Sequence, residues 1–100
     1  MLLNEVHNMQ KAGFVPYVML EEPLFLFMIS SNPKFGGSRP MISKGHVEDG
    51  EDIKDAAIRE AEEELGLIRA NVKSSFKAWV GQLSGMDAQY TLTVYSGGSS

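Results

Sequence analysis

Acidic side chains gather in one short stretch of the sequence, at spacings that could bind a metal ion. Nine of the thirteen Asp and Glu residues lie between Glu48 and Glu64, where there are only two bases. Glu60, Glu63 and Glu64 are three and four residues apart, so a helix would place them on adjoining turns. Carboxylate oxygens without thiolate or imidazole suit a hard divalent ion such as Mg²⁺ or Mn²⁺. The stretch therefore indicates either a metal site or a solvent-exposed acidic helix.

The same spacing excludes a calcium-binding EF-hand loop. If Gly50 were the loop glycine, the first ligand position would fall on Gly45 and the twelfth on Ala56, where acids are required.

The glutamate cluster also has an electrostatic cost, because like charges three and four residues apart destabilise a helix by about a few tenths of a kcal/mol per pair. Arg59 alone cannot neutralise three glutamates, so the cluster requires a further cation.

A helix over residues 52–65 is predicted to carry these glutamates. Asp52 is a suitable N-cap with Asp55 three residues later, and Gly66 suits the left-handed position that ends a helix. Apolar residues recur at helical spacing on one side of this segment, at Ala57, Ala61 and Leu65. The helix is therefore expected to bury this stripe and to present its glutamates beside it.

Strands are expected on both sides of this helix. Apolar and β-branched runs predict strands over 13–20, 24–29, 40–43, 76–83 and 90–95, and a weak helical pattern covers 2–11. Pro16 is expected at a sheet edge or bulge, and residues 30–39 as a loop. The Gly- and Ser-rich end, from about 96 to 100, is predicted to be a flexible tail. The elements together predict a mixed α/β fold.

Length and composition favour one cytoplasmic domain. The 100 residues are 43% hydrophobic and 22% charged, which predicts a single domain over 1–100 rather than a disordered chain. Cysteine is absent, so disulfides and thiolate zinc sites are excluded. No apolar run approaches the ~20 residues of a membrane span, and no signal peptide is recognisable, so no membrane association is expected. The net charge of −4 predicts no stable nucleic-acid partner.

The stretch 45–67 resembles the complete 23-residue box of the Nudix hydrolases, GX5EX7REUXEEXGU, where U is apolar. Every fixed position is filled, by Gly45, Glu51, Arg59, Glu60, Ala61, Glu63, Glu64, Gly66 and Leu67. The resemblance implies an α/β/α sandwich with a mixed sheet. It also implies hydrolysis of a nucleoside diphosphate linked to another moiety, with Mg²⁺, or Mn²⁺ as the alternative, as cofactor.

The resemblance implies metal ligands residue by residue. Glu60 and Glu64 correspond to the family's principal ligands, and Glu63 to a further ligand or a carboxylate that orients water. The backbone carbonyl of Gly45 corresponds to another contact with the metal. We hypothesise that one of these glutamates, directly or through metal-bound water, assists deprotonation of the attacking water.

Neighbouring residues are expected to support this site. Glu51 and Arg59 would hold the metal-binding glutamates in place, and we include both in the predicted catalytic set. Lys44 and His46 flank the first box glycine in a KGH sequence that resembles Nudix hydrolases of dinucleoside polyphosphates. Both are predicted to bind substrate phosphates, as is Arg39.

The substrate and the state of the chain are left open by the sequence. ADP-ribose, a diadenosine polyphosphate, FAD or a similar nucleotide would fit the resemblance. Only 33 residues follow Leu67, so the sandwich is expected to be short at its C-terminal end. An incomplete sheet would expose an edge, which favours a homodimer. The alternative function is a nucleotide- or metal-binding module with little or no turnover.

Overall fold

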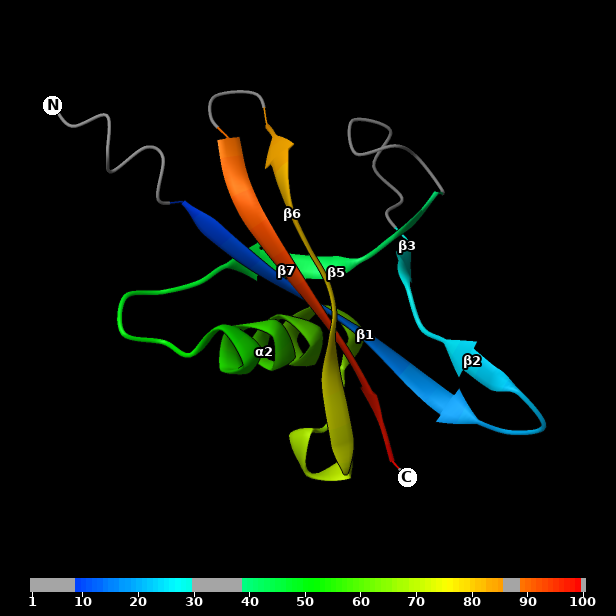
Figure 1. The fold of residues 1–100 in the computed structure, drawn as a ribbon. Helices are drawn as coiled ribbons and strands as arrows, with labels where there is room; N and C mark the ends of the chain where they lie inside the picture. The colour runs from blue at the N-terminus through cyan, green and yellow to red at the C-terminus, as the bar shows by residue number, and fades with distance from the viewer. Residues whose placement is uncertain (1–8, 30–38, 86–88, 100) are drawn as a thin grey trace, which may run out of the picture.

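A five-stranded mixed sheet with one α-helix on one side forms the body of the protein (Figure 1). The structure is a computed structural model, and it describes residues 9–29, 39–85 and 89–99. The sheet has the order β2-β1-β7-β6, and β5 pairs with β1 as well. Its elements are β1 (Gln10–Met19), β2 (Pro23–Phe25), β5 (Ser43–His46), β6 (Ser74–Ser84) and β7 (Gln89–Gly98).

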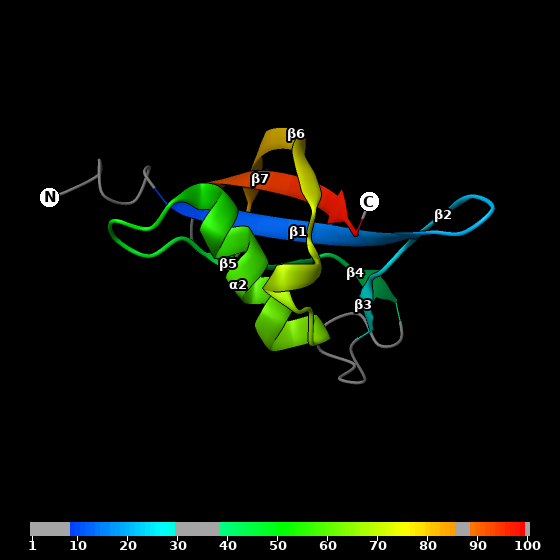
Figure 2. The same cartoon turned by 90° about the horizontal axis from the view of Figure 1, so that it is seen from below.

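The remaining elements of the described residues are two short strands, one α-helix and one 3₁₀-helix. Two two-residue strands, β3 (Met28–Ile29) and β4 (Pro40–Met41), pair with each other in a separate small sheet. The helix α2 (Ile53–Leu65) follows β5, and the 3₁₀-helix η2 (Arg69–Asn71) connects it to β6. Figure 2 shows α2 lying against one side of the sheet, close to β1 and β5.

Strand β1 lies at the centre of the sheet because it has partners on both sides. It runs parallel to β7 and antiparallel to both β5 and β2, which follow each other along the same side. Pairing with β5 ends at Phe14, and pairing with β2 begins at Tyr17. Pro16 lies in this gap, and its carbonyl accepts a hydrogen bond from Leu26 N on that side at 2.9 Å. The nitrogen of Pro16 faces this gap as well. Because no strand residue among those described requires a backbone N–H donor there, the proline costs the sheet little.

The helix α2 begins and ends at the predicted residues. The Asp52 carboxylate accepts hydrogen bonds from the backbone nitrogens of Lys54 and Asp55, at 3.0 and 3.3 Å. Gly66 ends the helix with φ of 73°, a left-handed conformation that glycine adopts without strain. Among the described residues α2 is the only α-helix, and no helix there has the length and apolarity to cross a bilayer.

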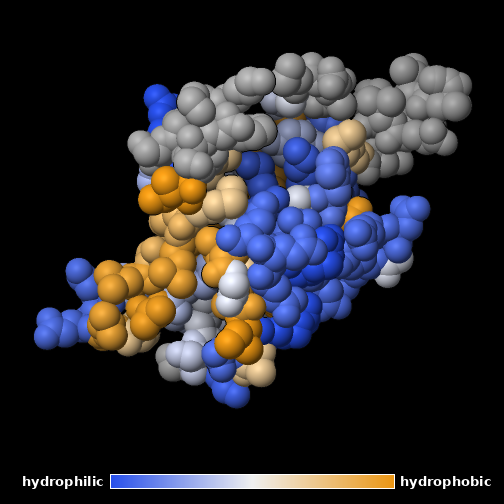
Figure 3. Space-filling view, turned by 180° about the vertical axis from the view of Figure 1, so that it is seen from behind, coloured by the Kyte–Doolittle hydropathy of each residue, from blue (hydrophilic) through white to orange (hydrophobic). Residues whose placement is uncertain are grey.

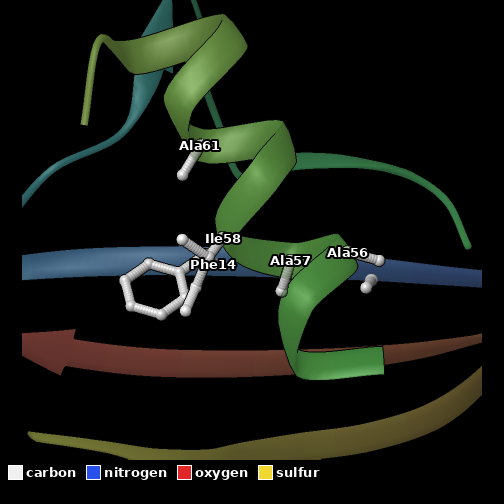
Figure 4. Packing of buried hydrophobic residues seen from close by; sticks show 6 residues of the cluster. Phe14, Ala56, Ala57, Ile58 and Ala61 are labelled. Atoms are coloured by element: carbon white, nitrogen blue, oxygen red, sulfur yellow. The ribbon is translucent and has the colours of Figure 1, made fainter. Parts of the chain in front are cut away.

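The main core lies between α2 and β1. Small residues of the helix pack against the sheet, where Phe14 of β1 is fully buried (Figure 4). The buried members of this cluster are Ala12, Phe14, Ala56, Ala57, Ile58 and Ala61. Alanines allow the helix backbone to approach the strands closely, and this approach brings the glutamates of α2 to the edge strand β5.

The sheet face away from α2 carries a second, smaller core. Val15, Leu92 and Val94 are buried there, but Phe76 and Trp79 of β6 are 55% and 48% exposed. Seen from behind the view of Figure 1, hydrophilic side chains cover much of the molecule, and apolar ones gather toward the β1–β2 hairpin (Figure 3). The predicted mixed α/β class is confirmed, but the described residues contain no second helical layer.

Several predicted boundaries are wrong. The strand predicted over 24–29 is interrupted after Phe25, because the chain makes its last hydrogen bond to β1 at Leu26 and pairs again only in β3. The segment predicted as one strand over 40–43 belongs to two strands, because β4 pairs with β3 and β5, which extends to His46, pairs with β1. The helix predicted over 2–11 falls mostly outside the described residues, and Gln10 and Lys11 belong to β1.

The predicted flexible tail is wrong from Ser96 to Gly98, which are buried residues of β7. The Ser96 hydroxyl donates a hydrogen bond to the carbonyl of Val15 at 2.8 Å. A side chain at Gly98 would place its Cβ 2.6 Å from the ring of Tyr17, so only glycine allows this ring to lie on the strand. Composition indicated flexibility here, whereas glycine in fact serves close packing.

The N-cap offers a test of how α2 is stabilised. Replacing Asp52 by Ala should lower the free energy of unfolding by about 1 kcal/mol, because two backbone N–H groups lose their acceptor. Urea unfolding followed by circular dichroism measures the change. Asp52→Asn, which keeps an acceptor, should remain within a few tenths of a kcal/mol of the original. Equal losses in both variants would contradict the capping role.

Candidate functional site

The candidate site lies where α2 crosses the edge strand β5. The carboxylate of Glu60 is packed directly against the backbone of Gly45, where a Cβ would come within 2.2 Å of it. A side chain at this position would displace the Glu60 carboxylate, so glycine allows that carboxylate to lie against the strand. This contact joins the first residue of the box to its central glutamate, 15 positions along the chain.

Arg59 connects three carboxylates and a backbone carbonyl. Its Nε and Nη2 donate to the two oxygens of Glu51 at 2.8 and 3.0 Å, a bidentate pair. Nη1 donates to Glu60 Oε2 at 3.0 Å and to Glu63 Oε1 at 3.4 Å, and Nη2 also donates to the carbonyl of His46 at 3.0 Å. The guanidinium thus fixes the loop after β5 to the middle of the helix.

The two partners of the bidentate pair shift each other's ionisation. Hydrogen bonds from Arg59 and from the backbone nitrogen of Glu48 lower the pKa of Glu51 to about 2. The same contact with Glu51 raises the pKa of Arg59 above its usual range. Both groups are therefore charged at neutral pH.

Glu64 is held from the strand side. The Ser43 hydroxyl and the backbone nitrogen of Lys44 both donate to its Oε1, at 2.7 and 3.0 Å. Ser43 is only 1% exposed, so this hydroxyl has a fixed orientation between strand and helix. The two bonds orient the Glu64 carboxylate while its other oxygen, Oε2, takes no part in them.

Glu60 carries a negative charge in an unfavourable environment. Partial burial raises its pKa, Arg59 opposes that shift, and the nearby charges of Glu63 and Glu64 raise the pKa further. Its side chain is 13% exposed, against 59% for Glu63. The folded protein thus holds the half-buried carboxylate of Glu60 near two other carboxylates, and Arg59 compensates only part of their charge.

The chemistry of this donor set fits a hard divalent cation. The side chains of Glu60, Glu63 and Glu64 offer only oxygen, and the backbone of Gly45 lies against the first of them. In the described part of the chain, however, no three acidic or histidine side chains already converge as a ready-made metal site. The carboxylates are held instead by Arg59, Ser43 and the backbone of Lys44.

The predicted substrate-binding residues lie apart from the helix. Strand alternation places Ser43 and Gly45 toward α2, so the side chains of Lys44 and His46 point to the other face of the sheet. Arg39 is exposed and immediately precedes β4. The structure thus brings together the predicted metal-binding and supporting residues but leaves these three bases outside that cluster.

A cavity of about 380 Å³ lies beside this cluster, along the loop between β5 and α2. Its lining includes His46, Glu48, Asp49 and Glu51. The metal-binding candidates on α2 are not among its lining residues, so the cavity adjoins the glutamate cluster rather than containing it.

Two residues of this region were not identified from the sequence. Ser43 anchors Glu64, but a serine in a short strand gives no sequence signal of such a contact. Lys11 lies opposite His46 in the β1–β5 pairing, and its ammonium group lies 4.4 Å from the ring centroid of Tyr90. The pairing of β1 with β5 therefore places Lys11 on the face of the sheet that carries Lys44 and His46, and no local sequence pattern predicts this.

The bidentate pair predicts a pH-dependent contribution to stability. Because the folded state lowers the pKa of Glu51, the stabilisation is complete above about pH 4.5 and is lost as the pH falls toward 2. Glu51→Gln should therefore be less stable than the original protein at pH 7, with a gap that narrows below pH 4.5. Urea unfolding of metal-free protein at several pH values measures this gap.

The matched control is Glu62→Gln, the same change at an exposed position of α2. It should cause a much smaller loss of stability at pH 7. A gap for Glu51→Gln that stays constant from pH 7 to pH 3 would contradict the ionic role of the pair.

Comparison with known proteins identifies a family and several solved structures of similar fold. The NUDIX domain model matches residues 10–92, while no curated protein matches the sequence. A binary complex of the C. elegans Ap4A hydrolase has a TM-score of 0.70 at 24% identity, over 89% of this chain and 64% of that one. A Nudix hydrolase from M. smegmatis, RenU, has a TM-score of 0.63 at 19% identity, over 95% and 61%. A mutT/nudix family protein from Listeria innocua has a TM-score of 0.56 at 19% identity, over 91% and 64%.

These similarities differ in what they establish. At such low identities the solved structures show a shared fold, and this chain spans less than two thirds of the length of each of these three. The family model covers most of the chain, and the glutamates of the box lie together at one strand–helix junction. The chain therefore belongs to the NUDIX domain family.

Proposed function

We propose that the protein is a Mg²⁺-dependent Nudix pyrophosphohydrolase that cleaves a diphosphate linkage in a nucleotide derivative. The observation that carries this proposal is the Glu60 carboxylate packed on Gly45, with Glu63 and Glu64 within one turn of it. Such a concentration of half-neutralised carboxylates repels a diphosphate unless a cation lies between them. The absence of cysteine agrees with a reducing compartment, and we propose a cytoplasmic location.

The metal would be held by Glu60, Glu64 and the backbone of Gly45, with Glu63 as a further ligand or as a carboxylate that orients water. When bound, Mg²⁺, or Mn²⁺ in its place, supplies charge neutralisation and polarises the phosphoryl oxygens. Burial and the charges of Glu63 and Glu64 raise the pKa of Glu60. A bound cation would lower this pKa again, because an opposite charge stabilises the ionised carboxylate. We assign Oε2 of Glu64 to the ion, because Ser43 and Lys44 occupy Oε1.

The chain's own residues divide the remaining tasks. Arg59, held by Glu51, keeps the glutamates in register with β5 through its contact with Glu60. One glutamate of the cluster accepts a proton from the attacking water, whose oxygen forms a bond to phosphorus. The bond from phosphorus to the bridging oxygen then breaks, and the leaving phosphate carries away the electron pair.

Dinucleoside polyphosphates are the substrates that the chain favours among the open possibilities. The KGH sequence at 44–46 resembles that of hydrolases for such substrates, and one structure of similar fold is an Ap4A hydrolase. Lys44 and His46 lie on an edge strand, and Lys11 lies near them, so an extended phosphate chain passing around this edge would meet three bases. ADP-ribose and FAD remain candidates, since each contains a diphosphate.

A metal-dependent nucleotide-binding module without turnover is the second candidate. It is favoured by the way Arg59, Ser43 and Lys44 already occupy the carboxylates of the cluster. Release of phosphate-containing products from Ap4A, ADP-ribose and FAD, with Mg²⁺ or with EDTA, separates the two functions. Metal-dependent thermal stabilisation by a nucleotide without any hydrolysis would support the binding module.

Substitution of one glutamate tests the enzyme directly. Glu64→Gln should lower kcat at least 100-fold with little loss of stability, because the amide keeps the shape but not the charge of the ligand. Glu62→Gln makes the same change at an exposed neighbouring position that we assign no role. Steady-state hydrolysis of the best substrate measures both, and comparable activity in the two variants would contradict the assignment of Glu64.

The contact from Ser43 generates a separate prediction for metal binding. Ser43→Ala removes the 2.7 Å hydrogen bond that orients Glu64, so the affinity for Mn²⁺ should fall about tenfold. Isothermal titration with Mn²⁺, without nucleotide, measures this affinity independently of turnover. Ser75→Ala, a serine of β6 remote from Glu64 in the sheet order, is the control and should bind Mn²⁺ normally. Unchanged affinity in Ser43→Ala would refute a role for this hydroxyl.

A further inference from the structure

A second cavity lies on the opposite side of the helix stripe from the glutamate cluster. Its volume is about 400 Å³, within the usual range for small-molecule sites. It is bounded by the first half of α2, by η2 with the residues after it, and by the start of β6. The residues that line it are Lys54, Ile58, Arg69, Val72, Lys73, Ser74 and Ser75.

This cavity is basic, in contrast to the acidic box beside β5. Three of its lining residues are bases, Lys54, Arg69 and Lys73, and none is an acid. Among the residues that the structure describes, Asp55 is the one acid that forms an ion pair with these bases, at 3.1 Å from Arg69 Nη1. One positive charge is thereby compensated, and the charges of the two lysines remain in excess in a protein whose net charge is −4.

The cavity also offers the other features of a specific site. Ile58 is buried and Val72 is half-buried, and these two side chains add a small apolar surface to a lining that is mainly polar. Ser75 contributes a hydroxyl from the strand. Two uncompensated ammonium groups beside a hydroxyl match the charge of a phosphate ester, which carries about −1.5 to −2 at neutral pH. Ile58 and Val72 would then contact the less polar part of the same molecule.

The helix geometry separates this cavity from the candidate active site. At 3.6 residues per turn, Lys54 and Ile58 lie on one side of the buried alanine stripe, and Glu60 and Glu64 lie on the other. No lining residue of the basic cavity belongs to the glutamate cluster or lines the cavity beside β5. The two proposed sites therefore share no lining residue.

We propose that the cavity between α2, η2 and β6 binds a small phosphorylated molecule, with Lys54 and Lys73 contacting its phosphate. The phosphate group provides most of the recognition, and Arg69 is kept in position by Asp55. The site requires no divalent metal, because its charge is already positive.

Titration with ribose 5-phosphate, followed by the backbone amide signals in heteronuclear NMR spectra, tests this proposal. EDTA is present throughout, so that metal-dependent binding at the glutamates does not contribute. We expect saturable shifts centred on Lys73 and Ser75, and none with ribose, which lacks the phosphate. The absence of saturable shifts, or equal shifts with ribose, would overturn the proposal.

Charge reversal at two lysines, one in the cavity and one outside it, provides a variant and its control. Lys73→Glu should weaken binding at least tenfold, whereas Lys77→Glu, an exposed lysine of β6 outside the cavity, should bind as the original protein does. Equal weakening by both would show a general charge effect and would refute the site. Should Lys73→Glu not fold, as judged by its amide spectrum, Lys54→Glu and Lys73→Gln make the same comparison.

Discussion

The arrangement of the site depends on Arg59 and on the carboxylates that surround it. The four glutamates between residues 60 and 64 of α2 repel one another, and this guanidinium compensates part of their charge through contacts with Glu60 and Glu63. Its bidentate bond with Glu51 is what fixes the guanidinium in place. One arginine cannot neutralise all of the surrounding carboxylates, so the site keeps a residual negative charge, and this charge is the basis of the proposed binding of a divalent ion.

Close packing makes this electrostatic arrangement possible. Alanines on α2 let the helix lie directly on β1, and Gly45 lets Glu60 lie directly on β5. The central position of β1, between β7 and the pair β5 and β2, supports both contacts. The same helix separates two regions of opposite charge, with the acidic box toward β5 and the basic cavity toward β6. This separation is the basis for proposing different ligands on its two sides, a metal ion with a diphosphate on one and a phosphorylated molecule on the other.

The sequence allowed the local features of the site to be predicted, and the reasons are physical. Both ends of α2 and its apolar stripe follow from local rules, so Asp52 and Gly66 were placed correctly. The spacing of the box identified the residues that meet at the helix. Contacts that depend on strand pairing were not predictable, which is why Ser43 was missed and why Lys44 and His46 point to the other face. The Gly- and Ser-rich composition of Ser96–Gly98 predicts a flexible tail, although pairing with β1 and β6 buries these residues.

The central claim is that Gly45 and the glutamates of α2 bind one divalent ion. Paramagnetic broadening of backbone amide signals by substoichiometric Mn²⁺ tests it most directly, because the effect falls steeply with distance from the ion. The account predicts that the signals of Gly45 and residues 60–64 broaden first, before those of the acidic loop 48–52. Broadening centred on that loop, or spread evenly over all exposed carboxylates, would contradict it.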